Sequence, residues 1–537
     1  MENTVSRQSD AARMTFLDAF KKMSGIAIPM ALSYTFSFEV FASGVLAGNY
    51  NDDKDHTAAI TIISTFMNTF LILGMSPLFA MAVVASNWLG DLRTYKEKPK
   101  NEQDDVELAT KRARISAVNR SGLIISAVAT PPVFLALFFS QAIATNVFRQ
   151  DENVAGIAQE YLRPYAFAVP GVLARMTFEQ MMFTVGKSRD AMYLGLASFT
   201  VGTLLSVWLG FGGLGIDAMG LKGIALGYVA EAYFIALMYG LYIYFKNECR
   251  EFRFFNLFNT DKKVIADVTS QVLTWSGPIS FTIGSELLMT FVVGIIAGAI
   301  SAESQAALSF VMQFIFLIFI FSAAFGIACQ QEVGREVGAK CYNDASRLAR
   351  YSLITTLSYI TPICVLIAAW PALLRKMLNN YDDTIVDTAN LLTPIMVSGI
   401  ILDAARYTML QELRSLADPW GSTALSFFGL AIGLCLSAIL GLATDLGIYG
   451  VGAGYTIGLG LAAFLLVFRW AKKTDVSYVE TVNERMKNLP GVRESLKSLF
   501  FGDTFKSHAH APASAINEAP IDERSPLLDK PLQQPPY

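Results

Sequence analysis

Long runs of apolar residues alternate with short polar segments along almost the whole chain. Seven runs contain no Asp, Glu, Lys or Arg, and they cover residues 56–90, 121–148, 191–216, 304–331, 351–374, 419–444 and 446–468. Each run exceeds the roughly 20 residues that an α-helix needs to cross the hydrocarbon core of a bilayer. The pattern therefore predicts seven membrane-spanning helices.

Five further apolar segments are long enough to cross a bilayer if internal charges are tolerated. They cover residues 24–49, 161–183, 221–245, 270–301 and 388–413. Together the segments predict an all-α membrane protein with twelve transmembrane helices, which we number 1 to 12 in chain order. Residues 1–22 are too polar and charged to contain the apolar region of a cleavable signal peptide, so we expect none.

The charges in the loops predict the orientation of these helices. Lys and Arg are concentrated in the loops that follow even-numbered helices, above all between helices 2 and 3. The positive-inside rule places such loops in the cytoplasm. We therefore expect a multi-pass protein with both termini cytoplasmic.

Similar residues recur at nearly constant offsets, which indicates an internal repeat. The matches are Arg120 with Arg350, Pro132 with Pro362, Pro164 with Pro394 and Gly220 with Gly450 at an offset of 230, and Ala58 with Ala306 and Gly90 with Gly338 at 248. Two six-helix halves in tandem have the same orientation because six is even. We therefore predict two lobes as parallel repeats around a central cavity, an arrangement in which transporters place their substrate site between the halves.

The repeat and the polar segments predict the domain boundaries. We expect a cytoplasmic N-terminus (1–22), a first six-helix lobe (23–246), a cytoplasmic linker (247–269), a second six-helix lobe (270–472) and a cytoplasmic tail (473–537). Residues near the end of the chain are rich in Pro, Ala and charge without helical periodicity. The tail is therefore expected to be largely disordered.

Composition supports a membrane protein and argues against several other classes. Of the 537 residues, 53% are hydrophobic and only 16% are charged, which is unusually apolar for a soluble enzyme. The five cysteines lack the spacing of a metal site or a disulfide framework. The GFGGLG stretch at 210–215 resembles a nucleotide-binding fingerprint in its letters only, because no strand precedes it. We expect no enzymatic activity, no cofactor, no metal and no nucleic-acid partner.

Several ionisable residues fall inside the predicted helices, where they are unusual. They are Glu39 in helix 1, Arg175 and Glu179 in helix 4, Glu231 in helix 6, Glu286 in helix 7, and Asp403, Arg406 and Glu412 in helix 10. A charge at the centre of a spanning helix costs about 2.5–3.5 kcal/mol on insertion scales, so such residues usually mark an ion or substrate path.

Local pairing is an alternative explanation for some of these charges. Arg175 and Glu179 are four residues apart, and Asp403 and Arg406 are three apart, so each pair could neutralise itself on one helix face. Glu286 has no basic residue within two turns on its own helix. A local partner therefore does not explain Glu286.

Three segments resemble the multidrug and toxic compound extrusion (MATE) family of transporters. They are Pro278 followed by Glu286 in helix 7, DAARYTMLQELRSLAD at 403–418 in helix 10, and GREVGAK at 334–340 at the end of helix 8. The resemblance implies that Glu286 and Asp403 couple transport to protons or sodium ions. The chain also departs from the family pattern, because Ser43 stands where bacterial members often carry Asp, and Glu39 lies one turn earlier.

The first functional hypothesis is a monomeric secondary antiporter that exports organic cations or related small metabolites in exchange for protons or sodium. One alternative is a lipid-linked precursor flippase of the same superfamily, which would tend to have two additional helices and a strongly basic cavity. The other is a non-transporting membrane scaffold, which would have no use for intramembrane acids. The candidate site comprises Glu286, Asp403, Glu39, Glu231 and Ser43, with Arg175, Glu179, Arg406 and Glu412 as secondary candidates.

The tail contains the sequence ERSPLL at 523–528. It resembles the acidic dileucine signals that eukaryotic sorting adaptors bind on the cytosolic tails of endosomal and lysosomal membrane proteins. An arbitrary linker is the alternative interpretation of so short a pattern. If Glu523, Leu527 and Leu528 form such a signal, the protein resides in late endosomal or lysosomal membranes and a sorting adaptor is a partner.

Overall fold

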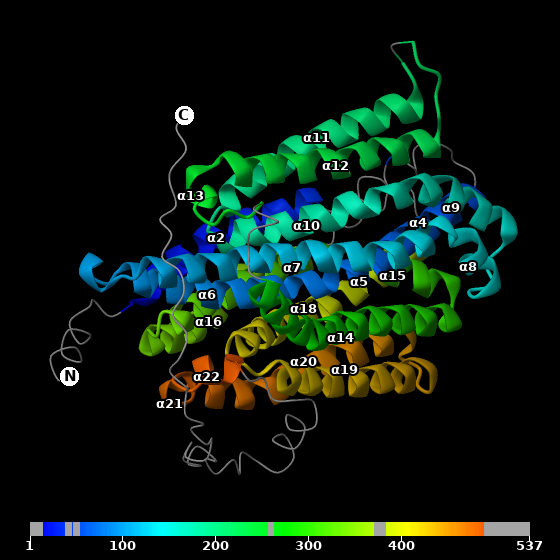
Figure 1. Ribbon diagram of the computed structural model, residues 1–537. Coiled ribbons are helices and arrows are strands. Elements are labelled where there is room, and N and C mark those ends of the chain that lie inside the picture. The colour runs from blue at the N-terminus through cyan, green and yellow to red at the C-terminus, as the bar shows by residue number, and fades with distance from the viewer. Residues whose placement is uncertain are drawn as a thin grey trace, which may run out of the picture.

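The described part of the chain is almost entirely helical (Figure 1). The computed structural model describes residues 14–37, 46, 54–213, 215–255, 262–369 and 383–487. The longer helices of the first half are α2 (Phe16–Ser37), α4 (Lys54–Phe66), α6 (Ala80–Lys96), α7 (Asp105–Phe138), α9 (Glu152–Tyr165), α10 (Val169–Thr184), α11 (Ser188–Phe211) and α12 (Leu221–Phe245). Those of the second half are α14 (Lys262–Ile300), α15 (Ala302–Gly338), α16 (Tyr342–Ala368), α18 (Asp383–Ser415), α19 (Pro419–Leu442) and α20 (Gly447–Lys473). The all-α membrane class is confirmed.

Ten helical segments among the described residues are long and apolar enough to cross a membrane. They correspond to the expected helices 2, 3 and 5 to 12. Expected helix 1 corresponds to α2, and most residues that follow it, including 38–45 and 47–53, lie outside the described part. Expected helix 4 is divided between α9 and α10, each shorter than a full span. The exact number of twelve therefore stays a prediction.

Prolines account for interruptions in two of the expected spans. Pro77 lies in the short 3₁₀ turn η3 (Ser76–Phe79), which joins α5 (Ile72–Met75) to α6, and Pro164 comes just before η5 (Ala166–Ala168). Proline has no backbone N–H and its ring crowds the preceding turn, so a helix tightens or bends there. The Pro77 carbonyl oxygen lies 2.9 Å from Ser276 Oγ of α14, which attaches the second half to this bend.

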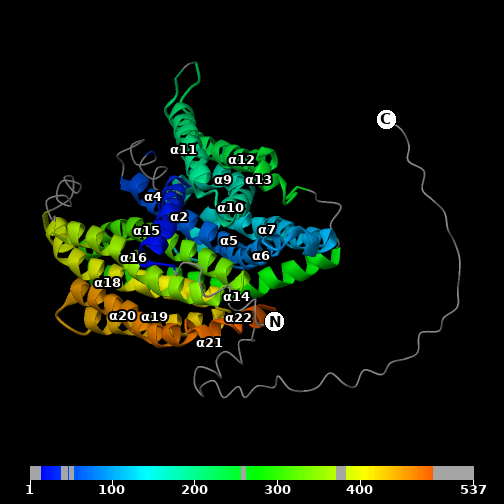
Figure 2. The same cartoon turned by 90° about the vertical axis from the view of Figure 1, so that its left-hand side faces the viewer.

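The two halves occupy opposite flanks of the helical bundle. Figures 1 and 2 both show α11 and α12 on one flank and α19 and α20 on the other, with α6, α14 and α15 between them. Contacts between the halves come mainly from α2, α6 and α7 of the first half with α14 and α15 of the second. A seam between the halves therefore runs through the middle of the molecule.

The last two helices of each half repeat the same close packing. Ser206 Oγ of α11 donates to the Ile224 carbonyl of α12 at 3.0 Å, and Ser437 Oγ of α19 donates to the Val451 carbonyl of α20 at the same distance. A Cβ on Gly227 would lie 2.4 Å from the Ser206 nitrogen, and a Cβ on Gly454 would lie 2.3 Å from the Ser437 nitrogen. The tandem repeat therefore appears in packing as well as in sequence.

One of the repeat matches was wrong in detail. The sequence comparison paired Gly220 with Gly450, but in the structure Gly220 and Gly447 both have positive φ, at 62° and 52°. Each lies at the start of the last helix of its half, where glycine tolerates a left-handed backbone at little cost. Gly220 therefore corresponds to Gly447, at an offset of 227.

Two expected boundaries also differ from the structure. The predicted linker ends at residue 269, but α14 begins at Lys262, because its buried residues Val268 and Val272 pack as the first turns of a helix. The predicted disordered tail starts at 473, but the short helices α21 (Val476–Val479) and α22 (Val482–Lys487) follow α20, and Val479 and Val482 are fully buried. Burial of these valines explains the additional structure.

Candidate functional site

Arg406 of α18 brings together the two acids that the sequence analysis ranked first. Its Nε donates to Asp403 Oδ1 at 2.6 Å, and its Nη2 lies 2.8 Å from Glu286 Oε1 of α14. Ser426 Oγ of α19 accepts a hydrogen bond from Arg406 Nη1 at 2.6 Å. The counter-charge for Glu286 therefore comes from a neighbouring helix.

The three charged groups of this triad differ in exposure and in geometry. The side chains of Arg406 and Asp403 are 2% and 8% exposed, whereas that of Glu286 is 21% exposed. The 2.8 Å contact to Glu286 lacks the alignment of a hydrogen bond, because Oε1 has no hydrogen-bond partner by geometry. Both acids therefore pair with Arg406, and Glu286 has the more exposed side chain of the two.

The packing of α14 fixes the position of Glu286. Thr282, one turn before Glu286, shares a 2.9 Å hydrogen bond between hydroxyls with Thr423 of α19, and Thr423 also donates to the Pro278 carbonyl at 3.3 Å. These bonds hold the segment around Pro278 against the helix that also carries Ser426. As a result, the Glu286 carboxylate faces Arg406.

Glu412 has a different environment from the triad. It is fully buried and accepts hydrogen bonds from the Ser352 hydroxyl, from Cys329 Sγ at 3.2 Å, and from the Trp470 indole N–H. The donors come from α16, α15 and α20, so this carboxyl joins four helices of the second half. That arrangement is typical of a residue that organises the core of its lobe.

The described candidates in the first half lie on α10 and α12. Glu179 of α10 is fully buried and accepts a 2.7 Å hydrogen bond from Ser33 of α2, and Arg175 lies one turn away on the same helix. Glu231 of α12 is 1% exposed and packs directly against Gly202 of α11, where a Cβ would lie 2.0 Å from Glu231 Oε2. Glu179 therefore contacts α2, and Glu231 contacts α11.

Two further candidates, Glu39 and Ser43, lie outside the described residues. Their roles therefore stay predictions. The described residues contain no group of three or more His, Cys, Asp or Glu side chains that could hold a metal ion.

A second set of charges, which the sequence analysis did not select, joins the halves at one end of the bundle. Lys22 Nζ of α2 lies 2.7 Å from Glu332 Oε2 and 3.0 Å from Glu336 Oε1 of α15, and Arg93 Nη1 of α6 lies 3.7 Å from Glu336 Oε1. Arg335 contacts Glu332 and donates to the Thr184 carbonyl at the end of α10. We call Lys22, Arg93, Glu332, Arg335 and Glu336 the end cluster.

The carboxylates of the end cluster are buried, although they lie near the ends of helices. Glu332 and Glu336 side chains are 1% and 6% exposed, against 34% for Lys22 and 61% for Arg93. Buried carboxylates need partners, and here the partners come from the other half of the chain. The sequence signal was present, since Glu332 directly follows a charge-free run and Glu336 lies one turn later, but their partners are far away in sequence.

The helix α22 reinforces the same end. Asn483 Nδ2 donates to the Val337 carbonyl of α15 at 2.8 Å, and Asn87 Nδ2 of α6 donates to Asn483 Oδ1 at 3.2 Å. A side chain from beyond the second lobe therefore connects one helix of each half. At the end where α6 and α15 terminate, the two halves are therefore joined by the ion pairs and by this short helix.

Comparison with known proteins gives consistent similarities. The MatE family model matches residues 109–208 and 278–439. The "probable multidrug resistance protein NorM" of Bradyrhizobium diazoefficiens is 23% identical over 478 residues, which cover 86% of this chain and 95% of that protein. Its namesake in Synechocystis is 23% identical over 391 residues, covering 71% of this chain and 81% of that protein.

Solved structures show the same fold at low sequence identity. A crystal structure of the eukaryotic MATE transporter AtDTX14 has a TM-score of 0.73 at 16% identity, covering 88% of this chain and 99% of that one. A transporter of the MOP superfamily from Pyrococcus furiosus, whose title describes a binding pocket of reverse polarity, has a TM-score of 0.69 at 16% identity, covering 86% and 97%. These likenesses establish the arrangement of the helices.

Proposed function

Because this chain belongs to the MATE family of transporters, we propose that it is a secondary active antiporter. It exports organic cations or related small metabolites in exchange for protons or sodium ions, by alternating access between the two halves. The curated relatives bear the name of multidrug resistance proteins, which supports efflux as the direction of transport. The observation that carries the proposal is the triad of Glu286, Asp403 and Arg406.

The charge of the triad is suited to exchange of one cation. With both carboxylates and the guanidinium ionised, the three groups carry one net negative charge, which a proton, a sodium ion or a cationic substrate would balance. Glu286 has the more exposed side chain of the two acids, and its ion pair with Arg406 lacks an aligned hydrogen bond. It can therefore bind and release a cation while Asp403 keeps Arg406 in place.

The end cluster supplies a closed side for alternating access. Its ion pairs join α2 and α6 to α15, so opening that side requires Glu332 and Glu336 to lose partners from the first half. The excess of Lys and Arg in the loops after even-numbered helices predicts that this side faces the cytoplasm. In this proposal, the end cluster keeps the cytoplasmic side of the protein closed.

Transport by purified protein in liposomes tests the proposal. We expect accumulation of a fluorescent organic cation to depend on an imposed proton or sodium gradient, and Glu286→Gln to abolish that dependence while leaving expression intact. Glu303→Gln, which removes an exposed carboxylate at the start of α15, is the matched control and should behave as wild type. Gradient-dependent uptake that persists in Glu286→Gln would refute the role of the triad.

Residence in late endosomes or lysosomes also stays a proposal, based on ERSPLL. Glu523, Leu527 and Leu528 lie outside the described residues. Changing both leucines to Ala should move a fluorescent fusion to the surface of a eukaryotic cell without altering its transport in liposomes. An unchanged distribution would leave ERSPLL as a chance match.

A further inference from the structure

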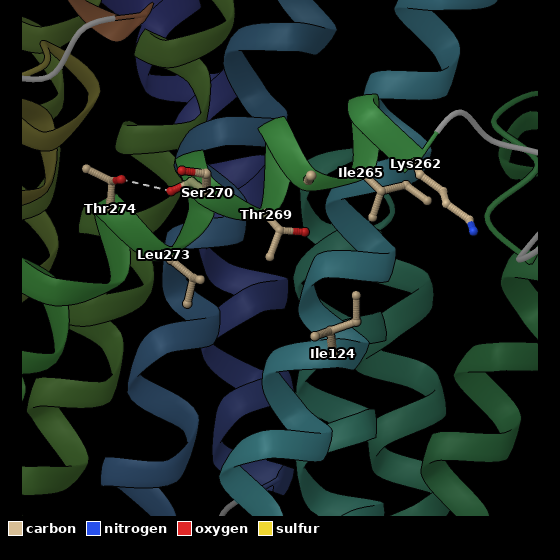
Figure 3. Close-up of a pocket in the computed structure, with 8 residues that line it drawn as sticks. Ile124, Lys262, Ile265, Thr269, Ser270, Leu273 and Thr274 are labelled. Atoms are coloured by element: carbon tan, nitrogen blue, oxygen red, sulfur yellow. Dashed lines mark hydrogen bonds between the residues drawn. The ribbon is translucent and has the colours of Figure 1, made fainter.

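A groove lies between α7 of the first half and the beginning of α14 of the second (Figure 3). Its volume is about 720 Å³, and its lining includes Ile124 of α7 with Lys262, Ile265, Thr269 and Leu273 of α14. Ile124 is 46% exposed and Leu273 is 52% exposed, so the groove opens on the outer surface of the bundle. It is separate from the triad and uses none of its residues.

A buried cation lies beside this groove. Arg120 precedes Ile124 by one helical turn on the same face of α7, and it is only 4% exposed. None of its three guanidinium nitrogens has a hydrogen-bond partner among the described residues. The next residue, Ser121, shares a 2.8 Å hydrogen bond with Thr269 of the groove, which places this turn of α7 directly against α14. A buried guanidinium without an anion is costly. An anion bound at this position would therefore stabilise the protein.

Among the described residues around the groove, no free carboxylate is available to fill that role. Lys262 is the charged residue in the lining, which contains no acidic side chain. Glu251, on the neighbouring connection, already contacts Lys96 and Arg112, and Asp267 on α14 is exposed and accepts a hydrogen bond from Gln271. The groove therefore combines positive charge at one end with isoleucine and leucine side chains along its length.

The position of the groove indicates the source of the anion. Lys262 begins α14 at the end of the bundle that the loop charges place in the cytoplasm, and the cytoplasmic leaflet carries the anionic phospholipids of the membrane. A free anion would use Arg120 and Lys262 but not the apolar lining. A lipid would use both.

We propose that this groove binds one anionic phospholipid of the cytoplasmic leaflet. Its phosphate group contacts Arg120 and Lys262, its glycerol region meets the hydroxyls of Thr269 and Ser270, and an acyl chain lies along Ile124 and Leu273. The lipid bridges the two halves at α7 and α14. This proposal does not rest on antiport, and it concerns a surface that no step of the transport cycle described above uses.

Lipid retention by the intact protein tests the proposal. Full-length protein is purified in mild detergent, incubated with equal amounts of phosphatidylglycerol and phosphatidylcholine, and examined by native mass spectrometry. We expect wild type to retain one phosphatidylglycerol preferentially. Arg120→Gln and Lys262→Gln should each weaken retention by about tenfold or more, because each removes a charged contact to the phosphate.

The matched control is Arg114→Gln. It removes one positive charge from the same helix at a side chain whose guanidinium stacks 4.4 Å from the Trp88 ring centroid. It should retain phosphatidylglycerol as wild type does. Equal retention of the two lipids by wild type, or equal loss of phosphatidylglycerol in Arg114→Gln and Arg120→Gln, would overturn the proposal.

Thermal stability separates a lipid site from a structural role of Arg120. Without added lipid, Arg120→Gln should melt at or above the temperature of wild type, because an unpaired buried charge has been removed. Phosphatidylglycerol should raise the melting temperature of wild type and not that of Arg120→Gln. If Arg120→Gln melts below wild type without lipid, Arg120 has a structural role. If inorganic phosphate stabilises wild type as strongly as the lipid does, the site binds soluble anions. Either result contradicts the proposal.

A variant that keeps both charges provides an independent test. Leu273→Trp fills the exposed part of the groove without touching Arg120 or Lys262. It should reduce retention of phosphatidylglycerol and leave the melting temperature of the lipid-free protein close to that of wild type. Full retention in Leu273→Trp would exclude the groove as the binding site, even if Arg120→Gln failed to fold.

Discussion

Gly90 of α6 and Gly338 of α15 form a symmetric crossing between the two halves. A Cβ on Gly90 would lie 2.0 Å from the carbonyl oxygen of Arg335, and a Cβ on Gly338 would lie 2.0 Å from the carbonyl oxygen of Asn87. Residues 87 and 335, like 90 and 338, are separated by 248 in sequence. The glycine of each half therefore contacts the equivalent backbone carbonyl of the other half. This contact leaves no room for a side chain at either position.

The first prediction concerns this crossing. Gly90→Val and Gly338→Val should each drive α6 and α15 apart, because the backbone carbonyl opposite cannot move without its helix. We expect a lower melting temperature and faster labelling of a cysteine placed at Ser86, which is fully buried at the crossing. The background should carry Cys341→Ser and Cys435→Ser, since those two cysteines are exposed.

Gly25→Val is the control for that measurement. Gly25 lies on α2, and a Cβ there would meet no atom within 4 Å. It should leave the labelling rate at residue 86 unchanged. Equal labelling in all three valine variants would show that the α6–α15 contact does not close this end.

A second prediction concerns the ion pairs of the end cluster. Glu332→Gln with Glu336→Gln removes the charges that hold Lys22 and Arg93. The short Lys22 contacts to these buried carboxylates contribute about 1.5–3 kcal/mol each, and the longer contact of the exposed Arg93 contributes less. The open form of this end should therefore become more populated by about tenfold or more. Cysteine labelling at residue 86 and the rate of substrate exchange at saturating gradient report the change. No increase in labelling would mean that the glycine contacts alone maintain closure.

The third prediction distinguishes Glu412 from Glu286. Glu412 accepts three hydrogen bonds in the core of the second half, and Gln would place donor hydrogens against the Trp470 N–H or the Ser352 hydroxyl. Glu412→Gln should destabilise the protein by about 1.5–3 kcal/mol, with gradient dependence retained in the protein that folds. Glu286→Gln should show the opposite result, a nearly unchanged melting temperature with gradient dependence lost. Transport assays and thermal melts on the same preparations provide the comparison.

A fourth prediction follows from Arg406. Glu286→Gln or Asp403→Asn leaves one carboxylate beside the guanidinium, but the double variant leaves it buried without any. Loss of both partners should cost about 3–5 kcal/mol and sharply lower expression. Adding Arg406→Gln to the double variant should restore expression without restoring transport. A double variant as stable as the singles would show that Arg406 does not depend on this pair.

The fifth prediction concerns pH and the connection between α6, α7 and the linker. Partial burial raises the pKa of the Glu251 carboxyl, but its contacts with Lys96 and Arg112 outweigh burial, so the pKa lies below its usual range. A carboxylate with a lowered folded-state pKa contributes stability above its unfolded pKa of about 4.3, and the contribution disappears as pH falls through the folded pKa. Wild type should therefore melt above Glu251→Gln at pH 7, with the difference shrinking below about pH 4.3. Glu160→Gln, at an exposed position on α9, should show no such pH-dependent difference.

The sequence alone predicted most of the membrane architecture. The apolar runs located ten of the spans, because the length of a hydrophobic segment is a local property that the bilayer thickness sets. The helix assignments of Glu286, Asp403, Glu179, Glu231 and Glu412 were also available from the sequence, since each interrupts an apolar run. The tandem repeat was visible as well, although glycine matching alone paired Gly220 with Gly450 instead of Gly447.

Tertiary structure decided which of these side chains meet. Glu286 and Arg406 are 120 residues apart, and Lys22 and Glu336 are 314 apart, so their pairing depends on how distant helices pack and rotate against each other. No periodicity along one helix contains that information. The sequence determined which helices carry buried charge, and the packing of α14 on α18 and α19, and of α2 and α6 on α15, determined where each charge finds its partner.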